Sequence, residues 1–260
     1  MMAMKTRLAA GVLGACGLLV AAGCSGQAAM AATGTPSAGH PCGTQAKPVT
    51  YQHVIWIWME NHSSSAIVGS SQAPYFNTLA KGCGLATNYH NITHPSLPNY
   101  IAATSGLSYS ALHGFLPDCG PSVSCDTSAK SIFGQGETWK SYEESMPSSC
   151  DHSNSGNYAV RHNPAVYYTT MHGCSGDDVS YSHLATDLAH NQLPAFSFIT
   201  PNLIDDMHNG TVADGNKWLS RNLPTGARSG TLFNHYSLLG TVEQLLGLVQ
   251  AGPGGQLPRR

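Results

Sequence analysis

The sequence predicts an α/β fold, in which parallel strands alternate with helices. Residues 53–59 and 195–200 are continuous apolar runs rich in β-branched and aromatic side chains, as expected for strands buried on both faces of a parallel sheet. Residues 236–249 repeat apolar side chains at helical spacing, which predicts an amphipathic helix near the C-terminus. No internal repeat or change of composition divides the chain, so residues 50–250 are expected to form one domain.

The composition limits the classes of protein to which this chain can belong. Of 260 residues, 42% are hydrophobic and 10% are charged, and there are 28 glycines and 15 prolines. This is too apolar for a disordered protein and too rich in Gly and Pro for a helical bundle. The formal net charge of −2 provides no basic field that would attract nucleic acid or anionic lipid. The 13 histidines favour metal ligation or proton transfer, although most are expected to be ordinary surface or core residues.

The N-terminal segment is predicted to be an export signal. Lys5 and Arg7 precede the uncharged segment 8–23, which is too short to span a bilayer comfortably. The segment ends at Cys24 in a sequence that resembles a bacterial lipoprotein cleavage box, while residues 29–31 offer an ordinary cleavage site. We therefore expect a protein that is secreted, or anchored to the outer face of the bacterial cell membrane by a lipid on Cys24. The expected organisation is a signal peptide (1–24), a flexible spacer (25–49), the domain (50–250) and a disordered tail (251–260).

Six cysteines follow the signal peptide, and an even number in an exported chain predicts three disulfides. The sequence does not fix their pairing. We favour the arrangement in which no two links cross, namely Cys42–Cys83, Cys119–Cys125 and Cys150–Cys174. A zinc cluster is the alternative, and it has little support because the sequence contains no Cys-x-x-Cys pair.

Polar side chains follow both predicted strands. Glu60 and Asn61 come after the first, and Asp206 and His208 come after the second. In open α/β sheets, ligands bind beyond the carboxyl ends of the strands. Carboxylate, amide and imidazole groups are ligands of hard and borderline cations, so the sequence predicts a site for a divalent metal ion of unknown identity. Ordinary polar loops are the alternative interpretation.

A serine lies at the start of another predicted helix. Pro95 and Pro98 hold the chain extended and then favour a helix start, which places Ser96 at or beside the N-cap. The N–H groups and the dipole at a helix N-terminus favour a bound phosphate and a serine alkoxide beside it. An ordinary capping serine is the alternative.

Six blocks of sequence follow one another in an order typical of a known family. They include Trp-Met-Glu-Asn at 58–61, His-Pro-Ser-Leu-Pro-Asn-Tyr at 94–100, Trp-Lys-Ser-Tyr at 139–142, Arg-His-Asn-Pro at 161–164, the segment 199–208 and Asn-His-Tyr-Ser-Leu-Leu at 234–239. With these blocks, the chain resembles the secreted phosphoesterase family that holds bacterial acid phosphatases and phospholipases C, within the alkaline phosphatase superfamily. The resemblance covers residues 53–248. It implies an alkaline-phosphatase-like three-layer αβα sandwich around a mostly parallel sheet.

The resemblance also implies an activity, the metal-assisted hydrolysis of phosphate esters through a covalent phosphoserine. Ser96 matches the nucleophile, and Glu60 and Asn61 match the first metal-binding pair. The expected substrate is a small, soluble phosphate monoester, and the expected oligomeric state is a monomer. The remaining candidates are Asp206, His208 and His235 for a second cation or the substrate phosphate, His94 and His162 for proton transfer, and Asn99 and His113 for substrate binding.

One segment of the family pattern is absent. In relatives, the helix that corresponds to residues 217–219 is followed by a strand ending in an Asp-Glu or Asp-His pair, which completes the metal site. Here the chain runs from Leu219 directly to Phe233, and no acidic residue occurs between Asp214 and Glu243. We therefore expect a sheet that lacks one strand or contains a gap, and a weakened metal site.

Two other functions remain open at this point. The first is a catalytically degenerate surface lipoprotein that retains phosphate or metal binding. The second is a metal-free serine esterase, since Asp205-x-x-His208 imitates a motif of some lipases. This second alternative lacks a Gly-x-Ser-x-Gly segment, and its Asp-x-x-His lies well before the C-terminus.

Overall fold

The computed structural model describes residues 52–82, 84–171, 174–222 and 229–234, with residues 239, 242, 243, 246 and 248. The predicted signal peptide, spacer and tail lie outside the described residues, and so does most of the predicted C-terminal helix. Within the described part of the chain, no helix has the length and apolar character needed to cross a membrane.

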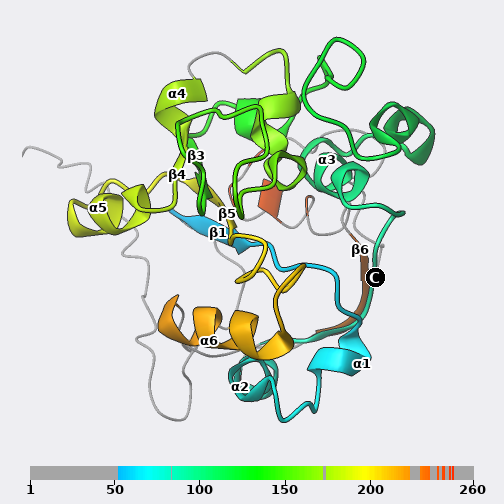
Figure 1. The fold of residues 1–260 in the computed structure, drawn as a ribbon, viewed down its shortest axis with the longest axis vertical. Helices are drawn as coiled ribbons and strands as arrows, with labels where there is room; N and C mark the ends of the chain where they lie inside the picture. The colour runs from blue at the N-terminus through cyan, green and yellow to red at the C-terminus, as the bar shows by residue number, and fades with distance from the viewer. Residues whose placement is uncertain are drawn as a thin grey trace, which may run out of the picture. The chain divides into compact units, whose positions relative to one another are not determined.

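Four parallel strands form the central sheet, in the order β1-β5-β3-β4 (Figure 1). They are β1 (Val54–Ile57), β3 (Trp139–Glu143), β4 (Asp178–Ser180) and β5 (Phe196–Thr200). β1 pairs with β5 from Val54↔Phe196 to Ile57↔Ile199, so the two predicted apolar strands are neighbours. The predicted α/β class is confirmed.

A second, separate parallel pair consists of β2 (Ala86–His90) and β6 (Ser229–Asn234). Among the described residues no strand connects this pair to β1, so the sheet of the described part of the chain is in two pieces. The edge of the gap is open to solvent, since four of the five β2 residues are exposed and Ile55 of β1 is 41% exposed. The expectation that β1 is buried on both faces is therefore wrong, since Ile55 is exposed and Trp56 alone among the four β1 residues is buried.

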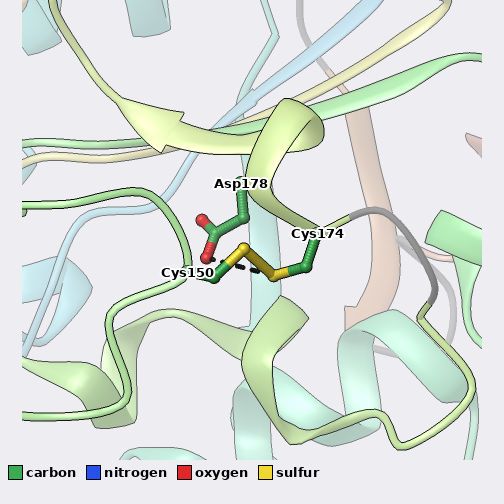
Figure 2. A group of neighbouring side chains, drawn as sticks. All are labelled: Cys150, Cys174 and Asp178. Carbon is green, nitrogen blue, oxygen red and sulfur yellow. Dashed lines mark hydrogen bonds between the residues drawn. A yellow bond between two sulfur atoms is a disulfide. The ribbon is translucent and has the colours of Figure 1, made fainter.

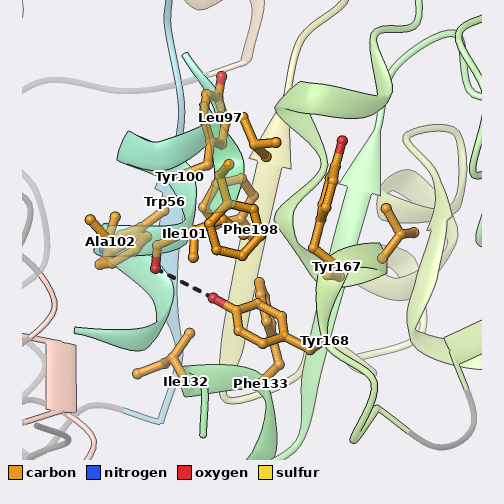
Figure 3. Packing of buried hydrophobic residues seen from close by; sticks show 14 of the residues in the cluster. Trp56, Leu97, Tyr100, Ile101, Ala102, Ile132, Phe133, Tyr167, Tyr168 and Phe198 are labelled. Atoms are coloured by element: carbon orange, nitrogen blue, oxygen red, sulfur yellow. Dashed lines mark hydrogen bonds between the residues drawn. The ribbon is translucent and has the colours of Figure 1, made fainter. Parts of the chain in front are cut away.

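Side chains alternate between the two faces of the sheet and fill a core on each side. On one face, Phe196 and Phe198 of β5 and Trp56 of β1 pack with α3 (Leu97–Ser105). Figure 3 shows Phe198 within this cluster, near the helix residue Ile101, whose carbonyl accepts a hydrogen bond from the hydroxyl of Tyr168. This core fixes the helix whose first turn follows Ser96.

The opposite face of the sheet is covered by α6 (Val212–Asn222), which lies on the other side from α3 in Figure 1. Ile199 and Tyr142 pack there with Trp218 and Leu219. The arrangement is a helix layer on each side of a parallel sheet, as the resemblance implies. The other elements are α1 (Ser64–Ile67), α2 (Pro74–Gly82), α4 (Cys174–Asp177), α5 (His183–Ala189), η1 (Tyr109–Phe115), η2 (Ile132–Gly134), η3 (Val160–His162) and η4 (Pro164–Tyr167).

Two of the three predicted disulfides are confirmed. Cys119 is bonded to Cys125, and Cys150 is bonded to Cys174. Figure 2 shows the second bond beside Asp178 of β4, with the Cys174 sulfur 4.0 Å from the carboxylate. This bond closes most of the connection between β3 and β4, which carries η3. The predicted third pair, Cys42–Cys83, lies outside the described residues.

Candidate active site

A cleft of about 940 Å³ opens where β1 and β2 end. Its wall is built from segments that sequence analysis singled out, which is consistent with ligand binding beyond the carboxyl ends of parallel strands. The lining residues are 57–64, 89–91, 94–96, Asn99, Asp118 and His208. The cleft therefore brings Glu60, Asn61, His94, Ser96, Asn99 and His208 to one place.

Ser96 stands at the N-cap of α3, as predicted, but its hydroxyl makes no capping hydrogen bond. The hydroxyl instead donates to Oε2 of Glu60 at 3.3 Å. The backbone N–H of Leu97, one residue further on, donates to Oδ1 of Asp118 at 2.9 Å. The capping interpretation is thus replaced by a serine whose oxygen faces the cleft and is oriented by a carboxylate.

His162 links Glu60 to a second carboxylate. The imidazole is 2% exposed, its Nδ1 lies 3.1 Å from Oδ2 of Asp206, and its Nε2 lies 3.6 Å from Oε1 of Glu60. The ring also stacks on Tyr100 of α3, with the centroids 5.2 Å apart. Burial lowers the pKa of His162 to about 4, so the imidazole is neutral at pH 7. With Nδ1–H donating to Asp206, Nε2 is left as a proton acceptor on the Glu60 side.

Asp206 is held by the loop that follows β5. Its N–H donates to the carbonyl of Asn202 at 2.7 Å, and its own carbonyl accepts the N–H of Glu60 at 2.7 Å. Oδ1 accepts the N–H of His208 at 2.6 Å, while Oδ2 faces His162. Burial raises the pKa of Asp206 to about 6, against these hydrogen bonds. The two strand exits are therefore tied together through Asp206.

The described residues at the cleft do not complete a metal site. Glu60 and Ser96 place two oxygens close enough to share one cation, but Asp206 uses both of its carboxylate oxygens on His162 and on the backbone of His208. The ring of His208 faces other partners, since Nδ1 contacts the side chain of Asn209. A cage with several carboxylates, as hard cations prefer, is thus not formed by these residues.

In the described part of the chain, the one group of three possible metal ligands lies outside the cleft. The His, Cys, Asp or Glu side chains that bring three ligand atoms within 4.8 Å of one another are Cys150, Cys174 and Asp178 (Figure 2). Their two sulfurs are joined in a disulfide, so they are not thiolate ligands. The remaining predicted ligand, His235, lies outside the described residues.

Of the other predicted site residues, Asn61, His94 and Asn99 line the cleft and His113 does not. His94 is exposed and lines the cleft, and Asn61 lines it with a positive φ of 58°. Asn99 is buried and gives its amide hydrogens to the carbonyls of Thr93 and Pro95 at 2.8 and 2.9 Å. It therefore orders the loop before Ser96. His113 is exposed on η1, packs against Tyr109, and is not among the residues lining the cleft.

Two residues of this region had no role in the sequence analysis. Asp118 accepts the N–H of Leu97, and Arg161 contacts both Asp118 and His208. Arg161 was visible only as part of the Arg-His-Asn-Pro block. The signal that could have identified it is its position, since only 10% of residues are charged and Arg161 directly precedes the candidate His162.

Similarity to known proteins identifies the chain as a hydrolase that acts on phosphate esters. Residues 58–229 match the sequence model of the Phosphoesterase family, and the chain belongs to this family. It is 28% identical over 247 residues to a phosphatidylinositol-3-phosphatase of Mycobacterium tuberculosis (strain ATCC 25618 / H37Rv), covering 80% of this chain and 81% of that protein.

Fungal acid phosphatases are also similar. The acid phosphatase of Aspergillus fumigatus is 28% identical over 65% of this chain and 39% of its own length. The phosphate-repressible acid phosphatase of Penicillium chrysogenum is 28% identical over 67% of this chain and 43% of its own length. The chain thus matches about two fifths of the length of these fungal relatives. The resemblance stated from the sequence is confirmed.

Proposed function

We propose that the protein is an exported, acid-phosphatase-like enzyme that hydrolyses phosphate monoesters through a phosphoserine on Ser96. The observation that carries this proposal is the hydrogen bond from the Ser96 hydroxyl to Glu60, at the start of α3 and at the wall of the cleft. Because the Ser96 hydroxyl donates to Glu60 and caps no helix N–H, the serine oxygen keeps lone pairs with which to attack a phosphate.

In this mechanism the Ser96 oxygen attacks phosphorus as its hydroxyl proton passes to Glu60, and the bond from phosphorus to the leaving alcohol breaks. Glu60 orients the hydroxyl, and His162, fixed by Asp206 on its other side, faces the second oxygen of Glu60. His94 lines the cleft and is placed to give a proton to the leaving oxygen. Water then cleaves the phosphoserine, which releases phosphate and restores the serine.

A divalent cation at this site would neutralise phosphoryl oxygens and lower the pKa of the serine hydroxyl. Glu60, Asn61 and the Ser96 oxygen offer an incomplete ligand set for it among the described residues, and Asp206, His208 and His235 are the alternative set. Because the described residues do not complete such a cage, we assign no step to the cation.

Small monoesters are the proposed substrates, and the expected state remains a monomer. Phosphatidylinositol 3-phosphate is the second substrate to test, because the M. tuberculosis relative is matched over most of both chains. Export by the N-terminal signal, with release or with a lipid on Cys24, belongs to the same proposal.

The test removes the nucleophile. Ser96→Ala should lower kcat for a chromogenic phosphate ester by about three orders of magnitude or more. Ser96→Thr should retain part of the activity, since threonine keeps a hydroxyl at this position. The control is Ser110→Ala, which changes an exposed serine on η1 and should behave as the unmodified protein. Acid-quenched protein should carry one phosphate on Ser96 in peptide mass mapping.

Other outcomes separate the alternatives. A fully active Ser96→Ala protein would replace the phosphoserine by direct attack of water. Cleavage of a chromogenic acyl ester that chelator does not affect would support the serine esterase. Phosphate binding without turnover of either ester would support the degenerate binding protein.

A further inference from the structure

The cleft beside Ser96 has carboxylates close to the position proposed for the substrate phosphate. Glu60 accepts the Ser96 hydroxyl, and Asp118 accepts the N–H of Leu97. Among the described residues that line the cleft there is no lysine or arginine. A phosphate dianion bound there would be repelled by two partly buried carboxylates, so its binding requires a cation close by.

Arg161 supplies a positive charge at the back of this wall. Its Nε lies 3.5 Å from Oδ2 of Asp118, and its Nη2 donates to Nε2 of His208 at 3.3 Å. Both partners line the cleft. The side chain is 23% exposed, and its backbone is fixed because the next residue, His162, is buried against Asp206.

Asp118 connects this arginine to the serine. One carboxylate oxygen accepts the N–H of Leu97, the residue after Ser96, while the other faces the guanidinium. The Asp118 carboxylate thus bridges the Arg161 guanidinium and the backbone N–H that follows Ser96. Lys140, another described cation, is by contrast committed to Asp187 at 2.6 Å.

We propose that Arg161 is a ligand of the substrate phosphate, held at the edge of the cleft by Asp118 and His208 until the substrate binds. This inference rests on the proposed function in one respect, the binding of a phosphate at Ser96. A guanidinium has five N–H donors in a planar fork, and the two contacts with Asp118 and His208 leave donors for two phosphate oxygens. A phosphate dianion carries more charge than the Asp118 carboxylate and therefore competes well for the same group.

The experiment measures binding of inorganic phosphate by calorimetry, with chelator present, so that neither turnover nor metal affects the result. Arg161→Gln should weaken phosphate binding by roughly 10- to 100-fold, the range for hydrogen bonds to charged groups. The phosphate affinity of Arg161→Lys should lie between those of the unmodified protein and Arg161→Gln, because lysine keeps the positive charge but lacks the planar set of N–H donors. Arg221→Gln, which removes an exposed arginine in the last turn of α6, is the matched control and should not change binding.

Asp118→Asn tests the holding role. Asparagine can still accept the Leu97 N–H, but it no longer competes for the guanidinium, so phosphate binding should tighten several-fold. Much of this gain should be lost in the double variant Asp118→Asn/Arg161→Gln, which a double-mutant cycle would reveal. With a monoester substrate, Arg161→Gln should raise KM more than it lowers kcat.

The opposite results would overturn the proposal. If Arg161→Gln binds phosphate as tightly as the unmodified protein, Arg161 is a structural residue. The same follows if Asp118→Asn changes phosphate affinity equally with Arg161 present and with Arg161→Gln. Absence of phosphate binding in the unmodified protein would overturn it as well. Arg161-dependent phosphate binding without hydrolysis would refute the proposed function and leave this inference standing.

Discussion

Replacement of Asp178 by Asn should change how the stability of the protein depends on pH. Asp178 and Glu143 are both buried, with side chains 0% and 1% exposed. Their hydrogen-bond partners are neutral, since Asn163 donates to both Asp178 oxygens at 3.0 and 2.9 Å, and Ser141 and Thr200 donate to Glu143. Burial raises the pKa of Asp178 to about 7. The pKa of Glu143 is also raised, first by burial and then by the charge of Asp178.

The sign of the effect follows from proton linkage. In the unfolded chain Asp178 has a pKa of 3.8, so between pH 4 and 7 the folded protein binds the proton more tightly than the unfolded chain. The contribution of Asp178 to the free energy of unfolding is therefore fully present below pH 4 and is lost as pH rises through 7. At about 1.4 kcal/mol per pH unit, the contribution of Asp178 between pH 5 and pH 8 is about 3 kcal/mol, as an upper bound.

Urea denaturation at pH 5 and pH 8 measures this contribution. Asn cannot ionise, so the difference in unfolding free energy between the two pH values should shift by about 3 kcal/mol in Asp178→Asn relative to the unmodified protein. Any loss of hydrogen bonding to Asn163 affects both pH values and cancels in the comparison. Glu137→Gln, which neutralises an exposed carboxylate, is the control. An equal pH difference in Asp178→Asn and the unmodified protein would refute the argument.

Two further predictions concern the disulfides and the metal. Replacing Cys150 and Cys174 together by Ala should lower the free energy of unfolding by about 2–4 kcal/mol in urea titrations, because the unfolded chain regains the freedom of the linked segment; unchanged stability would contradict this. Elemental analysis should show that Glu60→Ala leaves the content of divalent metal nearly unchanged, because Glu60 and Ser96 form an incomplete ligand set among the described residues. His235→Ala should lower it, because any retained cation is then expected to depend on the other predicted ligands, Asp206, His208 and His235. The reverse result would show that another acidic residue completes a cage at Glu60.

Strong local patterns made part of the fold predictable from the sequence. The run at 195–200 became β5, whose five residues are all buried, because a short β-branched and aromatic run has few alternatives in an α/β domain. The helix after Ser96 was predictable because Pro98 presets its first turn. The pair Cys119–Cys125 was predictable because the two residues are close in sequence.

Other features depend on tertiary contacts and could not be predicted in this way. The strand β3 contains Lys140 and Glu143, which by sequence alone read as surface residues, yet Glu143 is buried against β5. The sequence likewise presented Asn99 as a candidate phosphate donor, while the structure uses its amide on the loop at Thr93. The surrounding loops decide which polar groups face a ligand, and the spacing of residues in the sequence does not predict the conformations of these loops.

The divided sheet bears on activity through the position of the gap. The groups nearest the serine come from the intact side, since Glu60 follows β1, Asp206 follows β5, and these strands are paired along their length. Ser96 begins α3, whose core contacts are with the same two strands, and His162 stacks on that helix. The gap lies at the other edge of β1, where the described residues provide no neighbouring strand. A missing strand on that side, as the sequence predicts, would remove metal ligands and leave the support of the serine in place, so we expect nucleophilic chemistry at Ser96 to be retained even where cation binding is weak.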